Sequence, residues 1–217
     1  MRKAAIAGIS ESISKHPLNI MSLLSQYRKI ITNGHFFLNS LSYCALFSGL
    51  IVWITAGPFI IIDLFKLPTM YFAIFQGIIF GFFILGSLSL RLEIVMKYRA
   101  TLIKLLHLII LVASSTAVAL NYCFPHLLSG LIVPLCFYAF CGGILMPVLS
   151  RAAIDSCHSP MGAVIAVQAT MLSTFGVIGS AAVGYFYHHT LLSVTCIIFV
   201  LTCLAFMRVC LLSFARD

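Results

Sequence analysis

The sequence predicts an all-α polytopic membrane protein with six transmembrane helices. Of its 217 residues, 62% are hydrophobic and only 8% are charged, and the mean hydropathy is +1.13. Soluble domains are about 45–50% apolar and about 25% charged. The apolar residues suffice for about six spans of about 20 residues each. This composition excludes a water-soluble globule, a disordered chain, a disulfide scaffold and a nucleic-acid-binding domain.

Six apolar runs predict the six helices, which we place at 36–62, 70–90, 101–120, 127–150, 161–187 and 191–210. The six-helix domain therefore covers residues 36–210, preceded by a basic segment at 1–35 and followed by a short tail at 211–217. Within the first segment, apolar residues recur at helical spacing: Ile20, Leu23, Leu24, Tyr27, Ile30 and Ile31. They indicate either a short helix lying on the membrane surface or a solvated linker.

Basic residues predict the orientation of the chain. If the six runs alternate in direction, Lys66 alone among the 13 lysines and arginines falls on one side of the membrane. Cytoplasmic loops carry the excess of Lys and Arg. We therefore expect both termini, and the loop that follows the second helix, in the cytoplasm.

Two of the runs carry residues that interrupt helices. The first run contains Gly57 and Pro58, and the fourth contains Pro134, Gly142, Gly143 and Pro147. Proline removes a backbone donor and glycine lowers the cost of bending. Broken helices in corresponding positions of two three-helix groups are typical of inverted-repeat transporters. The alternative is that the prolines cause ordinary kinks.

Small residues at a spacing of four predict close helix packing. They are Gly77 and Gly81 in the second run, and Gly176, Ser180 and Gly184 in the fifth. Such spacing lets helix backbones approach closely in a membrane, where lipid supplies no hydrophobic driving force.

The sequence offers no group of residues for an active site, and we expect neither an enzyme nor a metal or cofactor site. The acids lie in loops or at helix ends, and no motif of a hydrolase, metalloprotease or nucleotide-binding protein occurs. His107, about two turns into the third run, is the one candidate for an ionisable group of a proton-coupled pump within the membrane. It is a candidate proton relay, the alternative being a histidine hydrogen-bonded between helices.

Aromatic, thioether and amide side chains inside the runs are candidates to line a cavity for a bulky apolar ligand. They are Tyr43, Phe47, Trp53, Gln76, Tyr138, Cys141, Gln168 and Met171. The alternative is that the amides bridge helices and the aromatic rings pack against lipid.

Several segments resemble major facilitator drug:proton antiporters of the Bcr/CflA type. "YCALFSGLIVWITAGPFIII" is similar to their seventh helix, and "FAIFQGIIFGFFILGS" to the eighth. "GGILMPVLSRAAID" resembles the end of the tenth helix, and "GAVIAVQATMLSTFGVIGSAAVG" the eleventh. In this chain Gly57 replaces the serine of the family's Ser-Pro-Phe. The resemblance covers about residues 25–210 and only the carboxyl-terminal half of such a transporter.

This resemblance implies one half of a major facilitator fold, built as a 3+3 inverted repeat, in a bacterial inner membrane. It implies proton-coupled efflux of hydrophobic drugs, with the bilayer, drugs and protons as partners. Tyr43, Phe47 and Trp53 would face substrate, with Tyr138 and Cys141 opposite. The small residues of the second and fifth helices would partly contact the other half, which is a second six-helix chain or a second copy. The alternative is a non-transporting membrane subunit or scaffold, or an inactive remnant.

Overall fold

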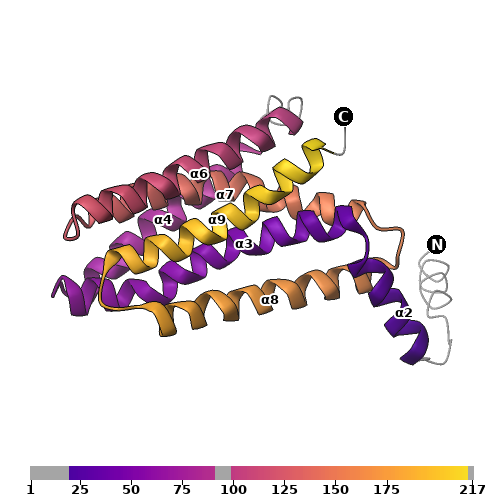
Figure 1. The fold of residues 1–217 in the computed structure, drawn as a ribbon, viewed down its shortest axis with the longest axis horizontal. Helices are drawn as coiled ribbons and strands as arrows, with labels where there is room; N and C mark the ends of the chain where they lie inside the picture. Colours follow the sequence, from indigo (N-terminus) through magenta and orange to yellow (C-terminus); the bar gives the residue numbers. More distant parts are fainter. Residues whose placement is uncertain (1–19, 91–98, 215–217) are drawn as a thin grey trace, which may run out of the picture.

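The computed structural model of the chain describes residues 20–90 and 99–214, which are helical apart from short connections. Figure 1 shows the helices side by side in one elongated bundle, with the short helix α2 at one end. Their bounds are α2 Ile20–Ile31, α3 Gly34–Pro58, η1 Phe59–Leu64, α4 Thr69–Ser89, α6 Arg99–Cys123, α7 Ser129–Asp155, α8 Met161–Phe186 and α9 Leu191–Phe214.

Within the described residues, six helices are long and apolar enough to cross a membrane, which confirms the predicted class. The spans are Gly34–Leu64, Thr69–Ser89, Thr101–Cys123, Ser129–Asp155, Met161–Phe186 and Leu191–Leu211. The predicted limits agree within a few residues, with the largest difference in α7. There the helix continues to Asp155, whose Oδ1 lies 3.1 Å from Arg151 Nε one turn earlier.

The packing relates two groups of three helices by an approximate two-fold symmetry. In the first group α3 packs on α8 and α9 of the second; in the second group α7 correspondingly packs on α4 and α6 of the first. The pairs α3–α7 and α6–α9 meet at the centre of this arrangement. Within a group, the first and second helices touch only sparsely. Neither group could therefore form a core without the other.

Burial separates central from peripheral helices. In α3 and α7, 61% and 72% of the most apolar window is buried, against 11% in α4 and 17% in α8. The core is apolar and consists mainly of side chains from α3, α7 and α9, with Trp53 and Tyr138 among the largest fully buried ones. The helices α4 and α8 flank the central pair and leave most of their apolar surface free.

The helix predicted near residue 20 is present as α2, rather than a linker without structure. Ile30 is buried against Val164 and Val167 of α8, whereas Leu24 and Ile31 remain exposed. The amphipathic pattern therefore serves partly to dock α2 on the bundle. Residues 1–19 of the 1–35 segment lie outside the described residues.

The predicted interruptions differ between the two proline-containing helices. After Gly57 and Pro58, α3 changes into the π-helical segment η1, so the backbone does depart from α-helical geometry there. The interruption predicted for α7 was wrong, because α7 is continuous through Pro134, Gly142, Gly143 and Pro147. In a helix, a proline ring crowds the carbonyl group of the residue four positions earlier. At both α7 prolines that earlier residue is a glycine.

Most of the predicted packing residues are not where helix backbones meet. A Cβ atom added at Gly77, Gly81 or Gly184 would have no neighbour within 4 Å, so these three contact no other helix of the described chain. Only the α8 pair touches α3: a Cβ at Gly176 would lie 3.8 Å from Phe47, and Ser180 Oγ accepts a hydrogen bond from Thr55.

Other glycines make the close approaches. A Cβ at Gly86 of α4 would collide with the carbonyl oxygen of Phe140, and one at Gly143 of α7 with that of Phe83. A Cβ at Gly179 of α8 would collide with the hydroxyl of Ser48. The α4–α7 and α3–α8 contacts, equivalent under the approximate symmetry, therefore both rely on glycine.

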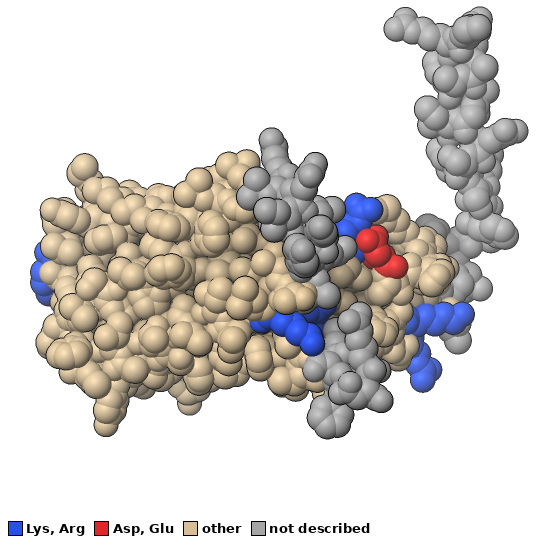
Figure 2. All heavy atoms as spheres, turned by 90° about the horizontal axis from the view of Figure 1, so that it is seen from above, with Lys and Arg blue, Asp and Glu red and all other residues tan. Residues whose placement is uncertain are grey.

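Charge divides along the long axis of the bundle. Figure 2 shows a small group of blue Lys and Arg atoms at the left end, an uncharged tan stretch beside it, and the other blue atoms from near the centre toward the right end. The start of α3 and the end of α9 lie at the same end of the bundle (Figure 1). An even number of spans with both described chain ends on one side fits this geometry.

Candidate functional site

Trp53 of α3 is directed at α4 rather than into an open cavity. Its side chain is fully buried, its Nε1 donates a 2.7 Å hydrogen bond to Gln76 Oε1, and its ring lies 6.0 Å from that of Phe72. Gly57 makes room for the same Phe72 ring, since a Cβ there would lie 2.6 Å from it. Trp53 and Gln76, both predicted as cavity residues, therefore bind each other.

A second glutamine occupies the equivalent place in the other group. Gln168 Oε1 accepts a 3.0 Å hydrogen bond from Ser150 Oγ of α7, and its buried Nε2 has no partner among the described residues. Gln76 and Gln168 are each the eighth residue of their helix, α4 and α8. Each joins the second helix of its group to the first, at opposite ends of the bundle. The two bonds thus follow the approximate symmetry.

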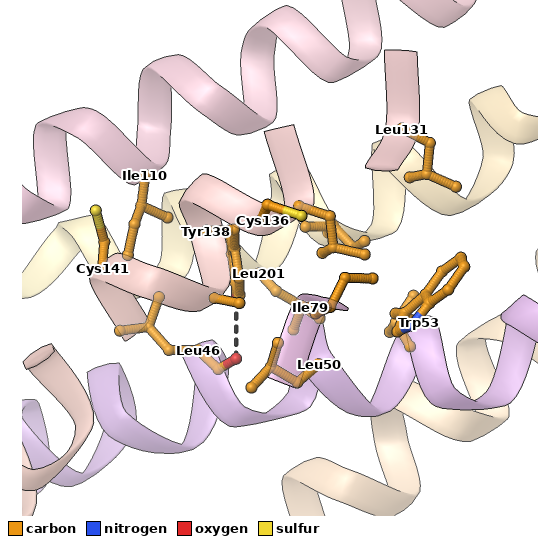
Figure 3. Packing of buried hydrophobic residues seen from close by; sticks show 14 of the residues in the cluster. Leu46, Leu50, Trp53, Ile79, Ile110, Leu131, Cys136, Tyr138, Cys141 and Leu201 are labelled. Atoms are coloured by element: carbon orange, nitrogen blue, oxygen red, sulfur yellow. Dashed lines mark hydrogen bonds between the residues drawn. The ribbon is translucent and has the colours of Figure 1, made fainter. Parts of the chain in front are cut away.

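Tyr138 fixes the contact between the two central helices. Its hydroxyl donates a 2.8 Å hydrogen bond to the carbonyl oxygen of Leu46, as Figure 3 shows by the dashed line. The same hydroxyl covers Gly49, where an added Cβ would collide with it. Cys141, one turn further along α7, is 2% exposed. Tyr138 and Cys141 lie inside the six-helix core, where they face other side chains of the bundle rather than an open cavity.

Three of the eight predicted cavity residues, Tyr43, Phe47 and Met171, are partly exposed and are not held by a side-chain hydrogen bond within the described residues. Tyr43 and Phe47 lie one turn apart on α3, half-buried against the main core. Met171 is half-buried on α8, against the smaller cluster that contains Val164 and Val167. The ring of Phe47 lies over Gly176. Together they leave an aromatic and thioether surface along the α3–α8 contact.

His107 of α6 is held inside the bundle by one contact within its own helix and one to α3. Its Nδ1 lies 2.7 Å from the carbonyl oxygen of Ile103, to which it can only donate. Its Nε2 lies 3.0 Å from Ser42 Oγ, which itself lies 3.0 Å from the carbonyl oxygen of Ala205. A neutral ring and this carbonyl compete for the one hydroxyl proton of Ser42. A doubly protonated ring would donate from Nε2 to Ser42 Oγ, and Ser42 could then donate to Ala205. All three hydrogen bonds would then form.

Arg208 enters the same region from α9. Its Nε donates a 2.7 Å hydrogen bond to Asn39 Oδ1, and Asn39 in turn donates to the carbonyl oxygen of His35. Asn39 is 4% exposed and lies one turn before Ser42 on α3. The polar cluster, which we define as Asn39, Ser42, His107 and Arg208, therefore joins α3, α6 and α9 near the basic end.

Sequence reasoning missed several residues of these contacts. Asn39, Ser42 and Ser150 gave no motif, and their only signal was polarity inside an apolar run. Arg208 lies near the end of the last apolar run, and nothing in the sequence indicated its bond to Asn39. Among the residues that the structure describes, no three His, Cys, Asp or Glu side chains are grouped as metal ligands would be.

Comparison with known proteins adds no assignment to this geometry. Neither a protein-family model nor a curated protein matches the chain.

Proposed function

We propose that the chain is one half of a major facilitator-type transporter, a proton-coupled permease that exports bulky hydrophobic compounds. The proposal depends on the packing between the two three-helix groups. The first helix of each group packs on the second helix of the other, so that α3–α8 and α7–α4 are equivalent contacts. In major facilitator transporters such inverted repeats are nested within each six-helix half, and the substrate site lies between the two halves. On this proposal the protein lies in a bacterial inner membrane with the basic end in the cytoplasm.

The free surfaces of α4 and α8 support a two-part assembly. These helices bury the least surface, and their small residues Gly77, Gly81 and Gly184 have open space around them. Small residues at this spacing favour close contact with another helix. We propose that this face meets a second six-helix unit, either another chain or a second copy. Tyr43, Phe47 and Met171 would then border the enclosed substrate path.

The proton step is assigned to the polar cluster. His107 can hold one or two ring protons without losing its contact to Ser42, and only the direction of the hydroxyl changes. Arg208, one turn beyond Ala205 on α9, is the charged group on the neighbouring helix and would oppose the second proton. His107 is therefore the candidate relay of this proposal.

Reconstitution tests the proposal directly. Purified chain in liposomes is given an imposed pH gradient and loaded ethidium, and efflux is followed by fluorescence. We expect proton-driven efflux that rises more steeply than linearly with protein density if two copies form the pathway. We expect Phe47→Ala to alter efflux of ethidium, and the exposed α9 variant Val200→Ala to leave it unchanged. Absence of efflux at every density contradicts a self-sufficient transporter.

A non-transporting subunit or scaffold is the second candidate, and a specific observation favours it. Trp53, Tyr138 and Cys141 are buried and occupied by internal contacts rather than lining an open path. This candidate, like an inactive remnant, predicts that Phe47→Ala changes no transport phenotype. For a scaffold, bulky residues at Gly77 or Gly81 would still abolish co-purification of a membrane partner; for a remnant, they would have no effect.

A further inference from the structure

A groove runs along the outer side of the bundle between α6 and α7. Its volume is about 460 Å³, within the range of sites for small apolar molecules. The residues that line it are Leu108, Ile109, Val112, Ala113, Thr116, Leu120, Val133, Pro134 and Phe137.

The groove exists because small side chains form its floor and large ones its walls. Ala113 and Pro134 are buried at the junction of the helices, whereas Val112, Val133 and Phe137 are more than half exposed beside them. The hydroxyl of Thr116 donates to the carbonyl oxygen of Ala113, so it offers no free donor to a ligand. The lining is therefore suited to a hydrocarbon chain.

A cation stands at one end of this apolar groove. Lys104 is exposed on α6, four residues before Leu108, so the two side chains share one helix face about 6 Å apart along the axis. Lys104 lies three residues after Thr101, where the apolar span begins, so we expect its ammonium group near the headgroups. Val112 lies about 12 Å along the axis from Lys104. One leaflet of hydrocarbon is about 15 Å thick.

We propose that this groove binds an anionic phospholipid, with the phosphate at Lys104 and one acyl chain along α6 toward Pro134. The charge selects the headgroup, because a Lys near the membrane surface attracts anionic lipid. The apolar lining favours binding of a hydrocarbon acyl chain over a polar molecule. This inference stands independently of transport, since it needs only the spans and the groove.

Photo-crosslinking tests the site in the full chain. The protein is reconstituted with phosphatidylglycerol, or with phosphatidylcholine of the same chains, each carrying a diazirine near the acyl terminus. We expect phosphatidylglycerol adducts on peptides of α6 and α7, and about fivefold less labelling in Lys104→Gln. Lys66→Gln, at the other end of the bundle, is the matched control and should label as the unaltered chain does.

A second variant tests the groove itself. Val133→Trp places a large ring in the groove from an exposed position and should abolish the α6 adducts, whereas Val200→Trp on exposed α9 should not. Unchanged thermal unfolding shows that each variant is folded. Equal labelling by both lipids, labelling retained in Val133→Trp, or protein–protein adducts in place of lipid adducts would each overturn the proposal.

Discussion

The indole nitrogen of Trp53 donates its hydrogen bond to Gln76, and this bond joins α3 to α4 where the two helices otherwise have little contact. Trp53 is the single tryptophan of the chain and is fully buried. Ser150 and Gln168 join α7 to α8 in the same way. In each three-helix group one glutamine therefore joins the first helix to the second, at opposite ends of the bundle.

Replacing Gln76 by leucine should destabilise the protein through Trp53. The indole N–H would stay buried without an acceptor, at a cost of about 1–3 kcal/mol. The loss of stability is measured by thermal unfolding in detergent. A thiol-reactive dye monitors unfolding by labelling the buried cysteines as they become exposed. The double variant Trp53→Phe with Gln76→Leu removes both partners and should unfold at a higher temperature than Gln76→Leu with Trp53 intact. The opposite order would show that the bond does not matter.

The glycines of α4 should differ sharply in their tolerance of a side chain, because Gly86 lies against α7 whereas Gly77 and Gly81 lie in open space. Gly86→Val drives a side chain into the backbone of Phe140, and overpacking of this kind costs typically about 1–3 kcal/mol. Gly77→Val and Gly81→Val enter open space and should leave the unfolding temperature of the isolated chain nearly unchanged. These two matched variants control for the change in helix propensity. Equal loss in all three would contradict the packing described.

The contact of Tyr138 with α3 predicts a rescue. Gly49→Ala should be destabilising, because the new methyl group collides with the tyrosine hydroxyl. Tyr138→Phe alone loses one hydrogen bond to Leu46, a loss of about 0.6 kcal/mol in membrane proteins. Combined with Gly49→Ala, it should recover part of the stability. If the two losses simply add, Gly49 and Tyr138 are not coupled as the structure indicates.

The hydrogen-bond chain through Ser42 predicts an unequal response to two substitutions. Ser42→Ala leaves His107 Nε2 buried without a partner, whereas His107→Leu still allows Ser42 to donate to Ala205. We expect the lower unfolding temperature for Ser42→Ala. A larger loss in His107→Leu would indicate that the imidazole supports α6 by packing rather than through Ser42.

The sequence predicted the number, order and approximate limits of the helices, because length and hydropathy decide them. It could not predict which faces of the helices meet. In a membrane span, residues that face lipid and residues that face the core are both apolar, so no amphipathic pattern separates Gly77 from Gly86. The short helix α2 was recognisable because one side of it faces polar surroundings.

The candidate site was predicted only in part. The two amides bridge helices, which was one of the two alternatives. Gln76 is bonded to Trp53, another of the predicted cavity residues. Sequence patterns could not show that Trp53 and Tyr138 point into the core, since an aromatic side chain suits a core and a cavity equally well. Asn39 and Ser42 were missed because single polar residues form no spaced motif that would mark them as a site.

The opposite orientation of the two three-helix groups is tested most directly by exposed histidines in three places. In a cysteine-free variant, His126→Cys lies between α6 and α7, whereas His35→Cys and His158→Cys lie at the other end of the bundle. An impermeant maleimide added to intact bacteria should label His126→Cys alone, and label the other two only after lysis. Labelling of His35→Cys and His158→Cys on opposite sides of the membrane would contradict the arrangement.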